Sequence, residues 1–148
     1  MFEQPVNAPM ILLVDDDADM TMGLSDRLTA EGCQVAIAHS GLEALHWLQG
    51  HRPSAVLLDF HMPEMDGIKT LQAIHTVDSK IPVIIVTGAE PQELLRHREL
   101  YTAAAYLPKP VEWIVLRQTL IVVLGQWLTG GARQRNRLSS APARKARS

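Results

Sequence analysis

The chain has 148 residues, of which 47% are hydrophobic and 20% charged, and it contains a single cysteine, Cys33. This is the length of one compact domain, with a core large enough to fold without disulfides or a structural metal. A lone cysteine cannot form an intrachain disulfide, which excludes a disulfide-rich secreted scaffold and favours the reducing cytoplasm. The N-terminus does not resemble a secretory signal, and no run of about 18 apolar residues is present that could cross a membrane.

The net charge of −2 conceals a strong asymmetry along the chain. Residues 129–148 carry six basic and no acidic side chains, which leaves eight basic against 16 acidic side chains, a net −8, in residues 1–128. The basic segment has too few apolar side chains to offset the entropy of ordering it. We therefore predict an N-terminal extension at 1–9, a folded domain at 10–128 and a disordered basic tail or linker at 129–148. A role as linker or solubilising end is favoured for the tail, and specific DNA binding is not expected.

The folded part alternates between two kinds of segment. Five short, nearly continuous apolar runs are typical of parallel strands covered on both faces: Met10–Val14, Gln34–Ala38, Ala55–Asp59, Pro82–Thr87 and Ala104–Leu107. Five segments with helical periodicity or helix-capping residues separate and follow them: Ala18–Glu31, Ser40–Gln49, Gly67–Thr76, Pro91–Glu99 and Val111–Leu128. This alternation predicts an open α/β sheet with right-handed crossovers.

Local signals mark some of the boundaries. Gly32 is placed to end the first helix, and Ser40 with Glu43 forms a capping box at the start of the second. Gly67 follows a turn and is predicted to adopt a left-handed backbone conformation.

Polar side chains gather at the predicted carboxyl ends of the strands, where ligands bind in sheets of this kind. They are Asp15, Asp16 and Asp17 after the first strand, Asp59 at the third, Thr87 at the fourth and Lys109 just past the fifth. Packed carboxylates repel one another unless a cation shares their site. A small set of oxygen ligands suits Mg²⁺, which often joins a phosphate. The sequence thus indicates metal-assisted phosphoryl chemistry, with Asp17 and Asp19 assigned to capping the first helix.

Four stretches, ILLVDDD, VLLDFHMPEMDG, VIIVTGAE and YLPKPVE, occur in an order and spacing that resemble those of a known family. The chain resembles the receiver domain of bacterial two-component response regulators, the CheY-like family, over residues 10–128. This resemblance implies a flavodoxin-like, doubly wound sheet of five parallel strands in the order 2-1-3-4-5, with five helices.

The resemblance also implies a metal site. Asp15, Asp16 and Asp59 match the acidic residues that bind Mg²⁺, Asp16 and Asp59 directly and Asp15 partly through water. His61 matches the position that offers its backbone carbonyl to the metal. Mn²⁺ is expected to be able to substitute for Mg²⁺.

The remaining correspondences concern the phosphoryl group. Asp59 matches the phosphoacceptor, Lys109 the lysine that pairs with phosphoryl oxygens, and Pro110 the partner in a cis peptide bond. Thr87 matches the hydroxyl that binds the phosphoryl group, and Tyr106 the aromatic side chain whose rotamer follows it as a switch.

The function implied is a phosphorylation-dependent switch. A sensor histidine kinase or phosphotransfer protein would donate to Asp59, and the surface of the fourth helix, fifth strand and fifth helix would respond. Such a domain is not an enzyme in the usual sense, since it catalyses only its own phosphorylation and dephosphorylation. Two alternatives are a degenerate receiver that acts only as an interaction module and a haloacid-dehalogenase-type phosphatase. The latter would use Asp15, Asp17, Thr87 and Lys109, but no cap insertion is present and Asp59 sits in a full acceptor motif.

The predicted fifth helix, Val111–Leu128, is apolar nearly all round, with Trp113 and Trp127 near its ends. A surface helix should show a single apolar stripe. Thr102–Ala105, where the family usually has Gly-Ala and two acids, makes the neighbouring surface more apolar as well. We expect a partner to cover this surface, and favour a homodimer over a different protein.

Overall fold

The computed structural model describes residues 8–60, 67–88, 91–126 and 128. Its strands form one parallel sheet in the order β2-β1-β3-β4-β5, as the resemblance implied. The strands are β1 (Met10–Val14), β2 (Gln34–Ala38), β3 (Ala55–Asp59), β4 (Val83–Thr87) and β5 (Ala105–Pro108). The helices are α1 (Ala18–Ala30), α2 (Gly41–Leu48), α3 (Gly67–Val77), α4 (Pro91–Leu95) and α5 (Trp113–Leu124), with a 3₁₀ helix η1 (Arg98–Thr102) after α4. The fold is therefore flavodoxin-like.

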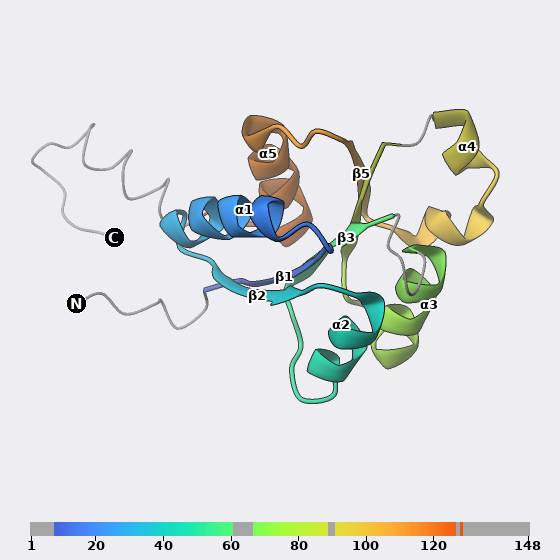
Figure 1. Ribbon diagram of the computed structural model, residues 1–148, viewed down its shortest axis with the longest axis horizontal. Coiled ribbons are helices and arrows are strands. Elements are labelled where there is room, and N and C mark those ends of the chain that lie inside the picture. Colours follow the sequence, from blue (N-terminus) through green and yellow to red (C-terminus); the bar gives the residue numbers. More distant parts are fainter. Residues whose placement is uncertain (1–7, 61–66, 89–90, 127, 129–148) are drawn as a thin grey trace, which may run out of the picture.

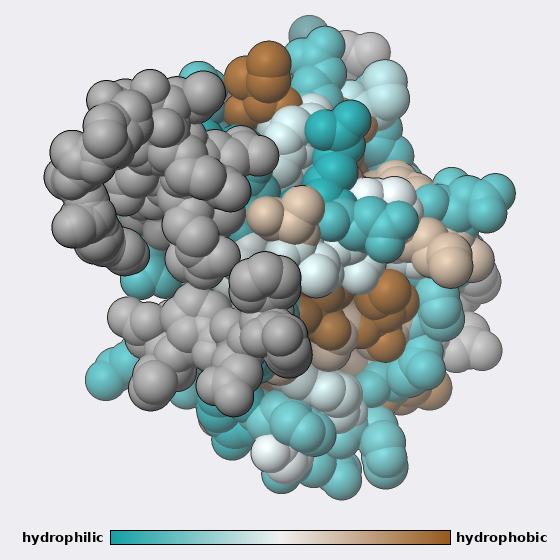
Figure 2. Space-filling model, turned by 90° about the vertical axis from the view of Figure 1, so that its left-hand side faces the viewer, coloured by the Kyte–Doolittle hydropathy of each residue, from teal (hydrophilic) through white to brown (hydrophobic). Residues whose placement is uncertain are grey.

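Helices cover both faces of the sheet, α1 and α5 on one and α2 and α3 on the other (Figure 1). Every residue of β3 and β4 is buried. Successive strand side chains point to opposite faces, so Leu12 packs in the core under α2 and α3 while Ile11 and Leu13 pack under α1 and α5. The described residues visible on the side where the strands begin are mostly hydrophilic, with small apolar areas between them (Figure 2). None of the described helices is long and apolar enough to span a membrane.

Capping residues define the N-termini of α1 and α2. The Asp17 carboxylate accepts the N–H of Met20, and the Ser40 hydroxyl accepts the N–H of Glu43 at 3.1 Å. The Glu43 carboxylate binds the N–H of His39 and not that of Ser40, so the reciprocal half of the expected capping box lies one residue earlier.

The prediction of a left-handed Gly67 is wrong, because Gly67 is the first helical residue of α3. Its lack of a side chain matters for a different reason. A Cβ atom there would lie 2.7 Å from the carbonyl oxygen of Phe60 and 2.8 Å from its Cα. Glycine thus permits the start of α3 to approach the end of β3. Gly32 does have a positive φ, 93°, after α1.

The last two helices are shorter than predicted. The segment expected to be one helix over 91–99 breaks after Leu95 and resumes as η1. The final helix begins at Trp113 and ends at Leu124, because Gly125 takes a left-handed φ of 70° and its N–H closes the last turn on Ile121. The predicted tail at 129–148 lies outside the described residues, as does all of the predicted extension except residues 8 and 9.

Candidate functional site

Three carboxylates meet at the carboxyl ends of β1 and β3. The two strands are parallel neighbours with Val14 opposite Leu58, which brings the next residues, Asp15 and Asp59, side by side. One oxygen from each of Asp15, Asp16 and Asp59 lies within 4.8 Å of the others. Asp15 and Asp59 are 4% and 3% exposed, whereas Asp16 is exposed.

The Asp15 carboxylate is only half satisfied. Its Oδ1 accepts the N–H of Asp17 at 2.9 Å, but its buried Oδ2 has no hydrogen-bond partner among the described residues. Burial raises the pKa of Asp15 above its ordinary value, and the charges of Asp59 and Asp16 add to that effect. A buried carboxylate oxygen without a donor, surrounded by like charge, fits the ligand set of a hard cation such as Mg²⁺. His61, the fourth predicted ligand, lies outside the described residues.

Lys109 supplies the nearest positive charge. Its Nζ lies 2.9 Å from Oδ1 of Asp59, and its backbone N–H donates to the carbonyl of Thr87. Although burial opposes it, the hydrogen bond to Asp59 and the charges of Asp59, Asp15 and Asp16 raise the pKa of Lys109. The Lys109–Pro110 peptide bond is cis, as the resemblance implied. The ammonium is thus held, charged, against the carboxylate at the end of β3.

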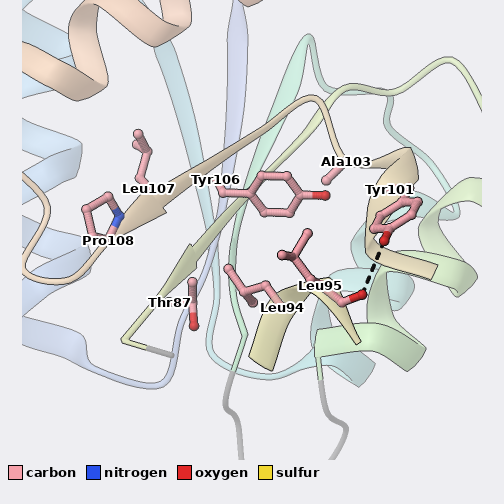
Figure 3. Close-up of a pocket in the computed structure, with 8 residues that line it drawn as sticks. All are labelled: Thr87, Leu94, Leu95, Tyr101, Ala103, Tyr106, Leu107 and Pro108. Atoms are coloured by element: carbon pink, nitrogen blue, oxygen red, sulfur yellow. Dashed lines mark hydrogen bonds between the residues drawn. The ribbon is translucent and has the colours of Figure 1, made fainter. Parts of the chain in front are cut away.

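Thr87 and Tyr106 lie on the two strands beyond β3. Thr87 ends β4 and is 3% exposed, one residue past Val86, which faces Asp59 across the sheet. Tyr106, on β5, is 40% exposed, its hydroxyl donates to the carbonyl of Leu100, and its ring points away from Thr87 (Figure 3). The structure brings Asp15, Asp16, Asp59 and Lys109 together, therefore, and leaves Tyr106 outside that cluster.

The sequence prediction missed His39. Its Nδ1 lies 3.1 Å from the carbonyl oxygen of Asp15, and the N–H of Asp15 donates to the carbonyl of Ala38. Residues at the end of β2 therefore bind both the N–H and the carbonyl group of Asp15. Its place in the sequence could have indicated this contact, because His39 directly follows β2, which pairs with β1.

Asp17, by contrast, serves α1. Its carboxylate is the helix N-cap, as predicted, and not a member of the acidic cluster found among the described residues. This use of Asp17 argues against the phosphatase alternative, which needs that carboxylate in the site.

A model of the response regulator receiver domain matches residues 11–121 of the chain. The chain belongs to this family. Among curated relatives, the receiver is 38% identical over 83 residues to the transcriptional regulatory protein PrrA of Mycobacterium tuberculosis, covering 56% of the chain and 36% of PrrA. It is 38% identical over 110 residues to the transcriptional regulatory protein ZraR of Klebsiella oxytoca, covering 74% of the chain and 25% of ZraR. The chain thus spans well under half the length of these relatives.

The receiver also resembles solved structures. A CheY-like response regulator receiver domain protein from Methanospirillum hungatei superposes with a TM-score of 0.75 at 28% identity. That alignment covers 80% of this chain and 95% of the other chain. The family and the sheet order predicted from the sequence are confirmed, and neither of the other function classes considered is supported by these relatives.

Proposed function

We propose that Asp59 accepts a phosphoryl group from a phosphohistidine of a sensor histidine kinase or phosphotransfer protein. The observation that carries this is the Lys109 ammonium 2.9 Å from Asp59 Oδ1, beside a buried Asp15 oxygen that no described residue donates to. A nucleophilic carboxylate flanked by a fixed cation and a cation-binding cluster is what in-line phosphoryl transfer requires. The proposal places the domain in the cytoplasm, where kinase and receiver meet.

In the transfer, an Asp59 carboxylate oxygen forms a bond to phosphorus while the bond from phosphorus to the donor histidine nitrogen breaks. The leaving nitrogen keeps that electron pair and is neutral or takes up a proton from solvent. Asp15, Asp16 and Asp59 would hold Mg²⁺, with the carbonyl of His61 as a further ligand by resemblance, and Mn²⁺ could take its place. The metal supplies positive charge to the phosphoryl oxygens. Lys109 supplies a further positive charge beside Asp59. The acyl phosphate is later hydrolysed by water, so no external substrate is turned over.

The resulting acyl phosphate would recruit the Thr87 hydroxyl at the end of the neighbouring strand. Tyr106 lies on the strand beyond, and its hydroxyl must leave the carbonyl of Leu100 for the ring to turn toward Thr87. These steps couple phosphorylation to the surface around Tyr106 as a shift between two conformations.

Acetyl phosphate with Mg²⁺, followed by intact-mass and peptide mass spectrometry, tests the chemistry. We expect one phosphoryl group on Asp59, and none in Asp59→Asn, which keeps the shape but removes the nucleophile. A phosphoryl group on Asp15 or Asp17 would contradict the assignment, and the absence of any adduct would leave a pure interaction module.

The proposed output is self-association through the α4–β5–α5 surface. We define this surface by its exposed large apolar side chains, which are Leu95, Tyr101, Tyr106, Ile114, Val115 and Val122. Six of the nine exposed large apolar residues of the described chain lie on it, and Val122 is 79% exposed. A second copy is the occupant favoured by the frequency of two-fold dimers. Sedimentation with and without beryllium fluoride and Mg²⁺ tests it, and a monomer under both conditions at high concentration would reject it.

A further inference from the structure

A cavity of about 650 Å³ lies between α4, η1 and β5 (Figure 3). It exists because α4 ends at Leu95 after five residues and the chain turns before continuing as η1. A longer regular helix would have laid further side chains over β5. Ala103, which follows η1 and lines the cavity, is too small to fill the space. The gap is therefore a consequence of the break in the predicted fourth helix.

The described cavity walls are mostly apolar. Aliphatic and aromatic side chains form most of the lining, chiefly Leu94, Leu95, Tyr101, Ala103, Tyr106 and Leu107. The Tyr101 hydroxyl donates to the carbonyl of Leu95 at 3.2 Å, and the Tyr106 hydroxyl donates to the carbonyl of Leu100. None of the described lining residues is charged. The volume and the apolar lining are those of sites that bind small organic molecules.

One wall of the cavity is the Tyr106 ring, which changes position in the proposed switch. Thr87 lies at one end of the cavity, and the Tyr106 ring runs along its side, pointing away from Thr87 (Figure 3). A Tyr106 ring turned toward Thr87 would occupy space that is now empty. A ligand in the cavity and an inward Tyr106 therefore exclude each other.

We propose that this cavity binds a neutral, flat aromatic molecule, and that the bound molecule holds the receiver in its unphosphorylated conformation. The described lining residues carry no charge that could pair with an ion, which disfavours charged ligands. The two tyrosine rings favour a flat aromatic body, which can stack or pack edge-to-face against them. The binding itself follows from the cavity alone, while its coupling to phosphorylation rests on the proposed function.

Indole is a suitable probe for the binding step. Titrated into the unphosphorylated full chain, it should shift the methyl resonances of Leu94, Leu95 and Leu107 in a saturable way. Ala103→Leu fills the cavity and should weaken binding about tenfold, the effect of removing the space a ligand group occupies. Ile114→Ala, a matched apolar truncation on α5 outside the cavity, should leave the affinity unchanged. Shifts that do not saturate, or that centre on Ile114 and Val122, would overturn the proposal.

The coupling is tested by repeating the titration with beryllium fluoride and Mg²⁺. Fluorine NMR on the same sample reports whether the adduct at Asp59 has formed. With the adduct present, we expect the affinity for indole to fall about tenfold, because the Tyr106 ring then competes for the space. Equal affinity in the two forms would overturn the coupling. Failure to form the adduct would count against the proposed phosphoacceptor, while the first titration still decides whether the cavity binds indole.

Discussion

The acidic edge of the sheet and the α4–β5–α5 surface are built in opposite ways. Asp15 directly follows β1 and Asp59 ends β3, and both are interior strands paired on both sides. The α4–β5–α5 surface rests on β5, an edge strand paired only with β4, and on a five-residue helix. The first region holds two buried carboxylates, Asp15 and Asp59, whereas the second presents large apolar side chains to solvent, among them Leu95 and Val122.

This difference matches the proposed role of each region. Phosphoryl transfer needs charges held in place before the reaction, which rigid strand ends provide. A switch needs a part whose alternative conformations differ little in free energy, and such parts come from the less stable end of a structure. A short helix beside an edge strand meets that need. Four tests can break or sharpen this contrast, from the largest expected effect to the smallest.

Replacement of Lys109 by alanine should have the largest effect. It removes the cation that pairs with Asp59, and the rate of phosphorylation by acetyl phosphate should fall about 100-fold. A mass-spectrometric time course with Mg²⁺ measures this rate. Lys80→Ala removes the same charge at an exposed position far from the site and should leave the rate unchanged. A near-normal rate in Lys109→Ala would show that the ion pair is structural only.

Two glycine replacements test how tightly the acidic edge is packed. Gly67→Ala places a Cβ against the backbone of Phe60, next to Asp59, and should lower the free energy of unfolding by about 2 kcal/mol. Gly23→Ala, on α1 with nothing within 4 Å of the added atom, should raise it by about 0.5–1 kcal/mol. Urea denaturation of both variants measures the difference. Equal effects would mean that the start of α3 shifts freely and that the edge is not rigid.

Asp15→Asn should stabilise the metal-free protein by about 1 kcal/mol at neutral pH. Because the pKa of Asp15 is raised in the folded state, the folded protein holds its proton more tightly than the unfolded chain does. This contribution is complete below the ordinary value of 3.8 and is lost as pH rises through the folded pKa, so ionised Asp15 costs stability at pH 7. The gain of Asp15→Asn should therefore fade at low pH.

Urea denaturation from neutral to acidic pH, without divalent metal, follows this dependence. Asp26→Asn removes one charge from an exposed position on α1 and serves as the control for net charge. With Mg²⁺ present, the unmodified protein should be more stable than Asp15→Asn. The variant binds the metal more weakly and therefore gains less stability from it. A gain in Asp15→Asn that persists unchanged at low pH would contradict the assigned cause.

Val122→Gln should have the smallest effect on stability. The side chain is 79% exposed, so the free energy of unfolding should change by less than about 0.5 kcal/mol. Self-association of the beryllium fluoride form, measured by sedimentation, should nevertheless weaken. Gln118→Ala, also exposed on α5 but polar, should leave association unchanged. A loss of folding stability in Val122→Gln would mean that this side chain belongs to the monomer's core.

The sequence by itself determined the order of the elements, the strand positions and the members of the acidic cluster. Buried parallel strands appear in the sequence as continuous apolar runs. A carboxylate at the end of such a run, such as Asp59, is therefore easy to recognise as a candidate site residue. Parallel strands also end at one edge of a sheet, so residues distant in the sequence, such as Asp15 and Lys109, could be placed together without coordinates. The resemblance of the motifs then predicted the role of each of these residues.

Only the tertiary structure decided what depends on neighbours from other segments. The need for Gly67 comes from the backbone of Phe60, and the support of Asp15 by His39 comes from the pairing of β1 with β2. The end of α4 at Leu95 and the orientation of the Tyr106 ring depend on how the segment after β4 packs against the edge strand β5. Local propensities differ there by about 1 kcal/mol or less per residue, so packing sets the outcome and the sequence pattern cannot.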